Sequence, residues 1–164
     1  GRRLCLRDRF GRGGEEAEYL KKHKIQFEII PGITSGIGSA TYAGIPLTHR
    51  KFASSVVFVT GHEDSEKKKE DVRWKKLAKS TDTIVIMMGL ARISKICKQM
   101  SEGGMEKNTP VAVIQDGTTS KQKMITGTIS NIAQKVKQSK IKPPSIIIIG
   151  KVVSLSKTIG WRKK

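Results

Sequence analysis

Short runs of consecutive apolar residues recur along the chain and are separated by polar segments with apolar residues at helical spacing. The apolar runs predict strands, and the four clearest lie at residues 55–60, 83–88, 111–114 and 146–153. Two weaker strands are predicted at residues 27–30 and 123–129. Continuous Val and Ile runs separated by helices are typical of a parallel sheet covered on both faces. We therefore expect an α/β fold with mostly parallel strands.

Five helices are predicted between these strands, at residues 13–20, 36–43, 72–79, 91–100 and 131–138. The clearest is 91–100, where Ile93, Ile96, Cys97 and Met100 follow the i, i+3, i+4, i+7 pattern of one buried face. The helix at 36–43 is weak by propensity, because Gly36 and Gly38 each cost up to about 1 kcal/mol relative to alanine. Close packing of the backbone would explain these glycines.

The turns that follow the predicted strands are rich in glycine and polar residues. They lie at residues 31–35, 61–63, 87–89 and 115–119 and at Gly150. Ligands of open α/β sheets bind beyond the carboxyl ends of the strands. We therefore expect these turns to form one ligand cleft, although a single glycine turn by itself indicates only a tight bend.

The chain is strongly basic. Its 164 residues include 32 Lys and Arg against 14 Asp and Glu, a formal net charge of +18. A solvated lysine-rich surface and a footprint for nucleic acid are both compatible with this excess. Aromatic residues make up 5% of the chain, which is few for a protein that stacks bases. A non-catalytic basic module that binds RNA remains the alternative, and nucleic-acid binding is the less favoured interpretation.

Several other classes of protein are excluded by the sequence. No apolar run approaches the ~20 residues of a membrane span, and no signal-peptide pattern is found, so we expect a cytoplasmic protein. Cys5 and Cys97 form no C-x-x-C pair, and the histidines lack metal-ligand spacing, so we expect no metal site. Patterns of P-loops, dinucleotide-binding turns and nucleophile elbows do not occur.

Seven short motifs follow one another in an order that is more specific than any of these patterns. They are GRGGEEAE at 11–18, IPGITS at 30–35, AGIPLTHR at 43–50, VTGHE at 59–63, MG at 88–89, QDGTT at 115–119 and KPPSI at 142–146. With them the chain closely resembles the tetrapyrrole methylase family from about Gly11 to its last residue. Within that family the resemblance is greatest to methylases of uroporphyrinogen III.

The resemblance implies methyl transfer from S-adenosylmethionine to two ring carbons of uroporphyrinogen III, which gives precorrin-2 on the route to sirohaem and cobalamin. A methylase of a later, cobalt-containing precorrin is a further alternative. By position, the cofactor-binding residues implied are Thr34, Ser35, Met88, Gly117 and Ser145. No catalytic residue is assigned.

The implied substrate carries many carboxylates. Arg12, His49 and Arg50 are therefore the candidate substrate-binding residues.

The resemblance also implies two α/β domains with the cofactor between them, and a homodimer. Residues 1–49 then correspond to the C-terminal remnant of the first domain, which is only partly present, and residues 50–164 to the second. The family's Gly-Gly-Asp-Pro-Phe loop is replaced here by LRDRF at 6–10, where Asp8 is the one candidate for the loop's aspartate. Bulky residues in place of glycines crowd a backbone approach. The family's preceding segment, with the Asp and Lys proposed as its acid/base groups, is also not part of this sequence. We therefore expect an N-terminally incomplete chain with impaired activity and weakened cofactor affinity.

Overall fold

The computed structural model describes residues 13–61 and 72–161. The chain divides into two compact units, Gly1–Thr34 and Ser35–Lys164, here called unit 1 and unit 2. This division falls before helix α2 (Ser35–Tyr42), whereas we expected the domain boundary near residue 49. Helix α2 therefore packs as part of unit 2, and the candidate cavity described below lies within that unit.

Unit 1 contains helix α1 (Gly13–Lys22), as predicted. Its first turn carries Glu15 and Glu16 and its last turn Lys21 and Lys22, the arrangement that the helix dipole favours. The strand predicted at residues 27–30 is wrong, because only Glu28 has bridge pairing. An apolar run becomes a strand only when a neighbouring strand completes its ladder of hydrogen bonds.

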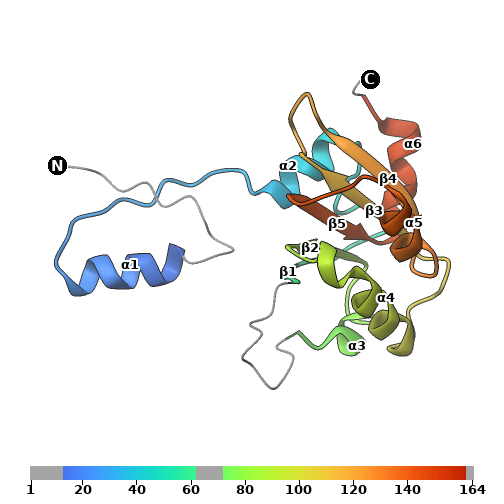
Figure 1. The fold of residues 1–164 in the computed structure, drawn as a ribbon, viewed down its shortest axis with the longest axis horizontal. Coiled ribbons are helices and arrows are strands. Elements are labelled where there is room, and N and C mark those ends of the chain that lie inside the picture. The colour runs from blue at the N-terminus through green and yellow to red at the C-terminus, as the bar shows by residue number, and fades with distance from the viewer. Residues whose placement is uncertain (1–12, 62–71, 162–164) are drawn as a thin grey trace. The chain divides into compact units, whose positions relative to one another are not determined.

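Unit 2 is built on a five-stranded sheet in the order β1-β2-β5-β3-β4 (Figure 1). The strands are β1 (Val56–Thr60), β2 (Thr83–Met87), β3 (Pro110–Gln115), β4 (Lys123–Thr128) and β5 (Ser145–Ile149). The predicted α/β class is confirmed, since helices and strands are interspersed along the chain, the strands form one sheet, and helices pack on that sheet.

The expectation of mostly parallel strands is wrong. Only β1 and β2 pair in parallel, whereas β2 with β5, β5 with β3 and β3 with β4 are antiparallel. Residues 116–122 join β3 to β4 directly, and so short a connection permits only an antiparallel hairpin. Burial on both faces produces continuous apolar runs whatever the strand direction, so this sequence pattern does not reveal the direction.

The reversed direction of β5 decides which residues meet at the end of the sheet where the cavity described below opens. Ile146 is in register with Met87 of β2 and with Ile114 of β3. The amino end of β5 therefore lies beside the carboxyl ends of β2 and β3. Gly150, which we placed in the expected cleft, instead lies at the opposite edge.

One face of the sheet is covered by α3 (Trp74–Leu77), α4 (Ile93–Glu102) and α5 (Ile132–Gln138). Alternate strand residues such as Ile84 and Ile86 pack with the buried side of these helices in one apolar cluster. The face predicted for 91–100 is confirmed, because its four apolar residues are at most 5% exposed.

The other face of the sheet carries α2 against β2 and β5. A Cβ atom on Gly36 would lie 2.9 Å from the ring of Phe58 and 3.1 Å from Val85. The glycine that weakens this helix by propensity therefore lets its backbone approach the sheet. Ala40 of the same helix is 1% exposed.

The last predicted strand, 146–153, stops earlier than expected. Gly150 has a φ of +145°, and a Cβ atom there would lie 2.5 Å from the carbonyl oxygen of Asp82. After this turn the chain forms a 3₁₀ helix, η2 (Lys151–Leu155), and then α6 (Ser156–Ile159). Val152 and Val153 remain buried, which explains why the apolar run continues past the strand.

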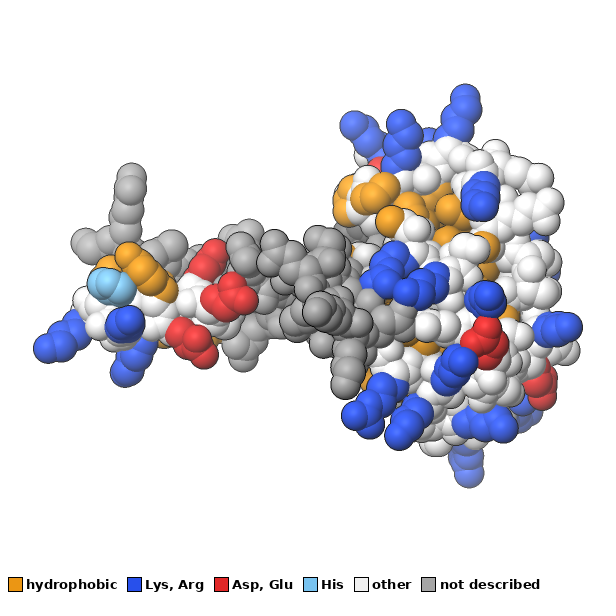
Figure 2. Space-filling view, turned by 60° about the horizontal axis from the view of Figure 1, so that its bottom comes forward, with side chains coloured by type: hydrophobic (Ala, Val, Ile, Leu, Met, Phe, Trp, Pro, Cys, Tyr) orange, Lys and Arg blue, Asp and Glu red, His pale blue; other side chains and the backbone are white. Residues whose placement is uncertain are grey.

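Basic side chains are spread over the face of unit 2 seen in Figure 2, with few acidic ones among them. The acid Glu102 of unit 2 forms an ion pair with Lys75, with 2.7 Å between Oε2 and Nζ. Lys75 lowers the pKa of Glu102 by the hydrogen bond of this pair and by its charge. None of the helices in the described ranges is long and apolar enough to cross a membrane.

Candidate functional site

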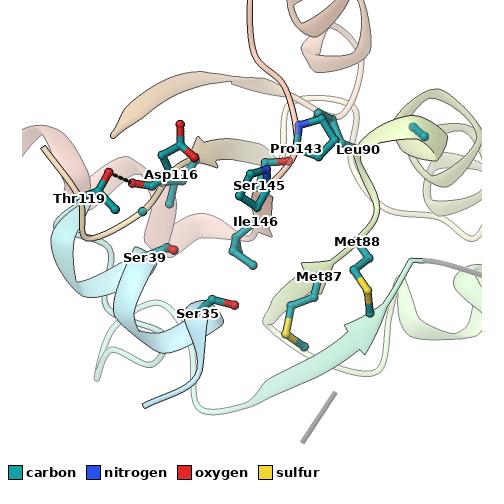
Figure 3. Close-up of a pocket in the computed structure, with 14 residues that line it drawn as sticks. Ser35, Ser39, Met87, Met88, Leu90, Asp116, Thr119, Pro143, Ser145 and Ile146 are labelled. Atoms are coloured by element: carbon teal, nitrogen blue, oxygen red, sulfur yellow. Dashed lines mark hydrogen bonds between the residues drawn. The ribbon is translucent and has the colours of Figure 1, made fainter. Parts of the chain in front are cut away.

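A cavity of about 670 Å³ opens at the edge of the sheet where β2 and β3 end. Four segments line it, namely α2, the turn after β2 at residues 87–91, the β3–β4 loop and the segment at residues 143–146 (Figure 3). This volume lies within the range of small-molecule pockets, about 300–1,000 Å³. Of the five expected turns, those at residues 31–35, 87–89 and 115–119 supply lining residues. Gly61 and Gly150 do not line the cavity, and residues 62–63 lie outside the described residues.

Helix α2 supplies two hydroxyl groups to one wall of the cavity. Ser35, its first residue, is exposed, and Ser39 is 3% exposed. Residues four apart lie on the same face of a helix, and both side chains line the cavity. The small residues around them allow this wall to lie close to the sheet.

Two consecutive methionines, Met87 at the end of β2 and Met88 directly after it, both line the cavity but differ in exposure. Met87 is 5% exposed and packs in the sheet, whereas Met88 is 52% exposed. Met88 has a φ of 57°, a left-handed conformation that a non-glycine residue rarely adopts. The backbone therefore turns Met88 away from the sheet and leaves its thioether at the cavity.

The β3–β4 loop forms a second wall and contains two further left-handed residues, Asp116 with a φ of 48° and Thr118 with a φ of 71°. The Thr119 hydroxyl donates to the Asp116 carbonyl oxygen at 2.7 Å, as Figure 3 shows. Gly117, between the two left-handed residues, packs directly on Ser39. Residues held in such conformations are characteristic of ligand-binding loops.

Side-chain amides attach this loop to its neighbours. Gln115 bonds to the backbone of Lys142 and to the carboxylate of Asp116, both at 2.8 Å. Gln122 donates to the carbonyl oxygen of Tyr42, at the end of α2, at 3.3 Å. The loop is therefore held from both walls of the cavity.

Two polar groups at the cavity have no partner within the described part of the chain. The hydroxyl oxygen of Ser145 is buried there without a hydrogen bond. The N–H of Gly117 also has no acceptor among the described backbone and side-chain groups. Buried polar groups are normally satisfied, so the Ser145 hydroxyl is the group that a ligand is expected to satisfy, whereas Gly117 is half-buried.

The chemistry of the cavity suits a ligand that is largely apolar and has a few polar groups. Its lining includes Ile114, Ile146, Leu90 and Pro143. Asp116 is the one charged residue among the lining residues that the structure describes. Such a surface can hold a flat ring system between a thioether and a glycine backbone, with hydroxyl groups at its rim.

Four of the predicted cofactor-binding residues meet in this cavity. Ser35, Met88, Gly117 and Ser145 all line it, although they are far apart in the sequence. Thr34 is the last residue of unit 1 and directly precedes Ser35. Their binding role stays a prediction.

Two of the three predicted substrate-binding residues, His49 and Arg50, are not among the lining residues, and the substrate-binding role of all three stays a prediction. Arg12 lies outside the described residues. The His49 ring is 5.0 Å from the Phe52 ring, and its Nδ1 accepts a hydrogen bond from Lys51 N–H. Neither His49 nor Arg50 lines the cavity, and in the structure His49 stabilises a turn.

The sequence analysis missed Ser39, Leu90 and Ala91 as lining residues. The signal for Ser39 was its spacing of four from Ser35, which places both on one face of a helix. Leu90 and Ala91 belong to a 3₁₀ helix, η1 (Leu90–Arg92), which precedes α4. No sequence pattern distinguishes a lining Leu or Ala from a core residue.

Comparison with known proteins identifies the family of this chain. The family model of tetrapyrrole (corrin/porphyrin) methylases matches residues 9–133. A uroporphyrinogen-III C-methyltransferase of Priestia megaterium is 48% identical over 147 residues, which are 90% of this chain and 61% of that protein. A sirohaem synthase of Nitrosomonas eutropha is 47% identical over 152 residues, 93% of this chain and 32% of that protein.

Among solved structures, one neighbour is the uroporphyrin-III C-methyltransferase of Thermus thermophilus in complex with S-adenosylhomocysteine. The TM-score is 0.75 at 30% sequence identity, and the match covers 88% of this chain and 59% of that one. The chain thus spans less than two thirds of the length of the relatives it matches.

Proposed function

Since the chain belongs to the tetrapyrrole methylases, we propose that the cavity of unit 2 binds the adenosine part of S-adenosylmethionine and that the whole protein methylates uroporphyrinogen III to precorrin-2. One observation carries this proposal. Ser35, Met88, Gly117 and Ser145, from four separate segments, line one cavity of about 670 Å³. The names of the relatives, a methyltransferase and a sirohaem synthase, support the same reaction.

The groups that line the cavity fit this cofactor. The unpartnered N–H of Gly117 and the buried hydroxyl of Ser145 offer hydrogen bonds to a purine or a ribose. The exposed thioether of Met88 offers a soft, polarisable surface to an aromatic ring. When bound, S-adenosylmethionine would supply an electrophilic methyl group on a sulfonium.

Thr34 and Ser35 are proposed to contact the cofactor beside Met88. They are consecutive hydroxyl residues, and Ser35 begins α2. The N-terminal turn of a helix leaves backbone N–H groups available for a ligand. Arg12, His49 and Arg50 remain the proposed partners of the substrate carboxylates.

The proposal includes a homodimer in the cytoplasm. It takes the cytoplasm from the biosynthetic names of the relatives and the dimer from the family resemblance. Light scattering of the purified chain tests the dimer by its mass.

Calorimetric titration with S-adenosylhomocysteine tests the cofactor site. Because LRDRF at 6–10 replaces the family's glycine loop, we expect measurable binding that is weaker than micromolar. Micromolar affinity would show that this loop is not needed for tight binding. No heat with S-adenosylhomocysteine, together with salt-dependent binding of an oligonucleotide, would favour the RNA-binding alternative.

Incubation of the chain with uroporphyrinogen III and methyl-labelled S-adenosylmethionine tests the reaction separately. We expect slow transfer of label to the tetrapyrrole. Transfer to a cobalt-containing precorrin, with none to uroporphyrinogen III, would assign the chain to a later step of tetrapyrrole methylation.

A further inference from the structure

Gln115 joins two segments that line the candidate site. It is the last residue of β3 and is in register with Ser145 of β5. Its Oε1 accepts a hydrogen bond from the N–H of Lys142, and its Nε2 donates to Oδ2 of Asp116, both at 2.8 Å. One side chain therefore holds the segment before β5 and the first residue of the β3–β4 loop.

The backbone reinforces the same junction. The N–H of Asp116 donates to the carbonyl oxygen of Pro144 at 3.2 Å. Asp116 is in the left-handed region, so its conformation needs support from its surroundings. Gly117, the next residue, packs directly on Ser39 of α2. The position of Gly117 thus depends on how Asp116 is held.

The Asp116 side chain is directed away from Ser35 and Ser39, as Figure 3 shows. Its carboxylate contacts Gln115 on the side of the loop that faces away from those hydroxyls. Asp116 therefore acts on the cavity wall through its backbone and through Gln115.

We propose that Gln115 is a positioning residue which, through Asp116, sets the Gly117 backbone and the Ser145 wall for the nucleoside part of the ligand. This inference rests on the proposed function. The direction of the hydrogen bond from Gln115 to Asp116 makes the proposal testable, since the Gln115 amide can donate only through its nitrogen and accept only through its oxygen. Only the donating half of Gln115 faces the carboxylate.

Two substitutions should first break and then restore the hydrogen bond between positions 115 and 116. In Gln115→Glu, two carboxylates face each other and the hydrogen bond is lost. In Gln115→Glu combined with Asp116→Asn, the amide of the new side chain at 116 donates to the carboxylate at 115, and the net charge equals that of the wild type. In Asp116→Asn alone, the new amide oxygen still accepts from Gln115 Nε2.

The experiment is calorimetric titration of the full chain and its variants with S-adenosylhomocysteine, which lacks the sulfonium charge and so responds little to an added carboxylate. We expect Gln115→Glu to bind about tenfold more weakly, or ~1.4 kcal/mol. The double variant should recover to within about twofold of the wild type. Gln134→Glu, an exposed change on α5, is the matched control.

Amide hydrogen exchange at positions 116 and 142 supplies a readout without ligand. Gln115→Glu should exchange several-fold faster at the Asp116 amide, and the double variant should recover. The Lys142 amide keeps an oxygen acceptor at position 115 in both variants and serves as the internal reference. Equal affinity of the wild type and Gln115→Glu, or no recovery in the double variant, would overturn the proposal. Absence of binding by the wild type would refute the proposed function instead, and unchanged exchange would then refute the positioning role by itself.

Discussion

Gly117 of the β3–β4 loop packs so closely on Ser39 of α2 that a Cβ atom on Gly117 would overlap the Ser39 hydroxyl. The two residues belong to adjoining walls of the cavity. Their contact sets how near the loop lies to the helix. A side chain at position 117 must therefore move one of the walls.

We expect Gly117→Ala to lower the free energy of unfolding by about 1–3 kcal/mol, the usual cost of overpacking, and to weaken binding of S-adenosylhomocysteine. Addition of Ser39→Gly should restore much of the binding, because the nearest remaining Ser39 atom is Cα at 3.1 Å from the new Cβ. Thermal denaturation and calorimetry measure the two effects.

Gly14→Ala is the control for this pair, because nothing lies within 4 Å of a Cβ atom at Gly14. It should leave both the stability and the ligand affinity nearly unchanged. Equal effects of Gly117→Ala and Gly14→Ala would contradict a close contact between Gly117 and Ser39.

The neighbouring methionines both line the cavity, but they should differ in their contribution to stability. Met87→Ala removes a side chain that is 5% exposed, so we expect a loss of about 2–5 kcal/mol of stability. Met88→Gly removes a side chain that is 52% exposed and relieves a left-handed φ of 57°. Its stability should stay the same or rise by about 1 kcal/mol, while the affinity for S-adenosylhomocysteine falls.

Denaturant unfolding and calorimetry on the two variants check this prediction. A large stability loss in Met88→Gly would mean that Met88 packs in the core. Unchanged affinity in Met88→Gly would remove Met88 from the proposed cofactor site.

Much of the fold could be predicted from local sequence, because the helices and strands follow directly from apolar spacing. The strand direction could not. The runs at β2 and β5 are equally apolar, and their opposite directions depend on connections and on the register of Met87 with Ile146. The prediction of a strand at 27–30 was wrong for a related reason, since an apolar run does not reveal whether a neighbouring strand is present to pair with it.

The candidate site could be predicted where a residue that suits ligand binding follows a predicted strand. Met88 and Gly117 follow strands, and the resemblance to the methylase family drew attention to both. Ser39 was missed because nothing in the sequence states that Gly117 packs against it. Conversely, His49 belongs to a recognisable motif but does not line the cavity.

Asp82 connects the start of β1 to the start of β2, and this contact should make stability depend on pH. Its Oδ2 accepts hydrogen bonds from the N–H and hydroxyl groups of Ser54 and Ser55, at 2.8–3.1 Å. The hydrogen bond from Ser54 N–H is the largest cause that lowers the pKa of Asp82 below its ordinary value. A lowered pKa in the folded state means that the ionised form favours folding.

The stabilisation by Asp82 is therefore present above the unfolded pKa, about 3.9, and is lost as the pH falls through the lower folded value. We expect Asp82→Asn to have a lower Tm than the wild type at pH 7, and the difference to shrink below about pH 4. Glu106→Gln removes the same charge from an exposed acid and serves as control. A pH-independent difference for Asp82→Asn would contradict this reasoning.

Cys97 of α4 should report opening of the core of unit 2. Its side chain is 5% exposed, and burial raises the pKa of its thiol to about 11. Because the thiolate is the reactive form, the folded protein should react very slowly with an alkylating reagent at pH 8. In a Cys5→Ser background, we expect labelling at least about a hundredfold slower than in urea, since reaction requires local opening.

The matched control for Cys97 moves the single thiol by one position, through Cys5→Ser, Cys97→Ala and Lys98→Cys together. Lys98 is exposed on the same helix, so its replacement should react at nearly the rate seen in urea. Mass spectrometry of both proteins during labelling gives the two rates. Similar rates at positions 97 and 98 would mean that α4 does not stay packed on the sheet, and the wall that η1 forms just before it would then lack a rigid support.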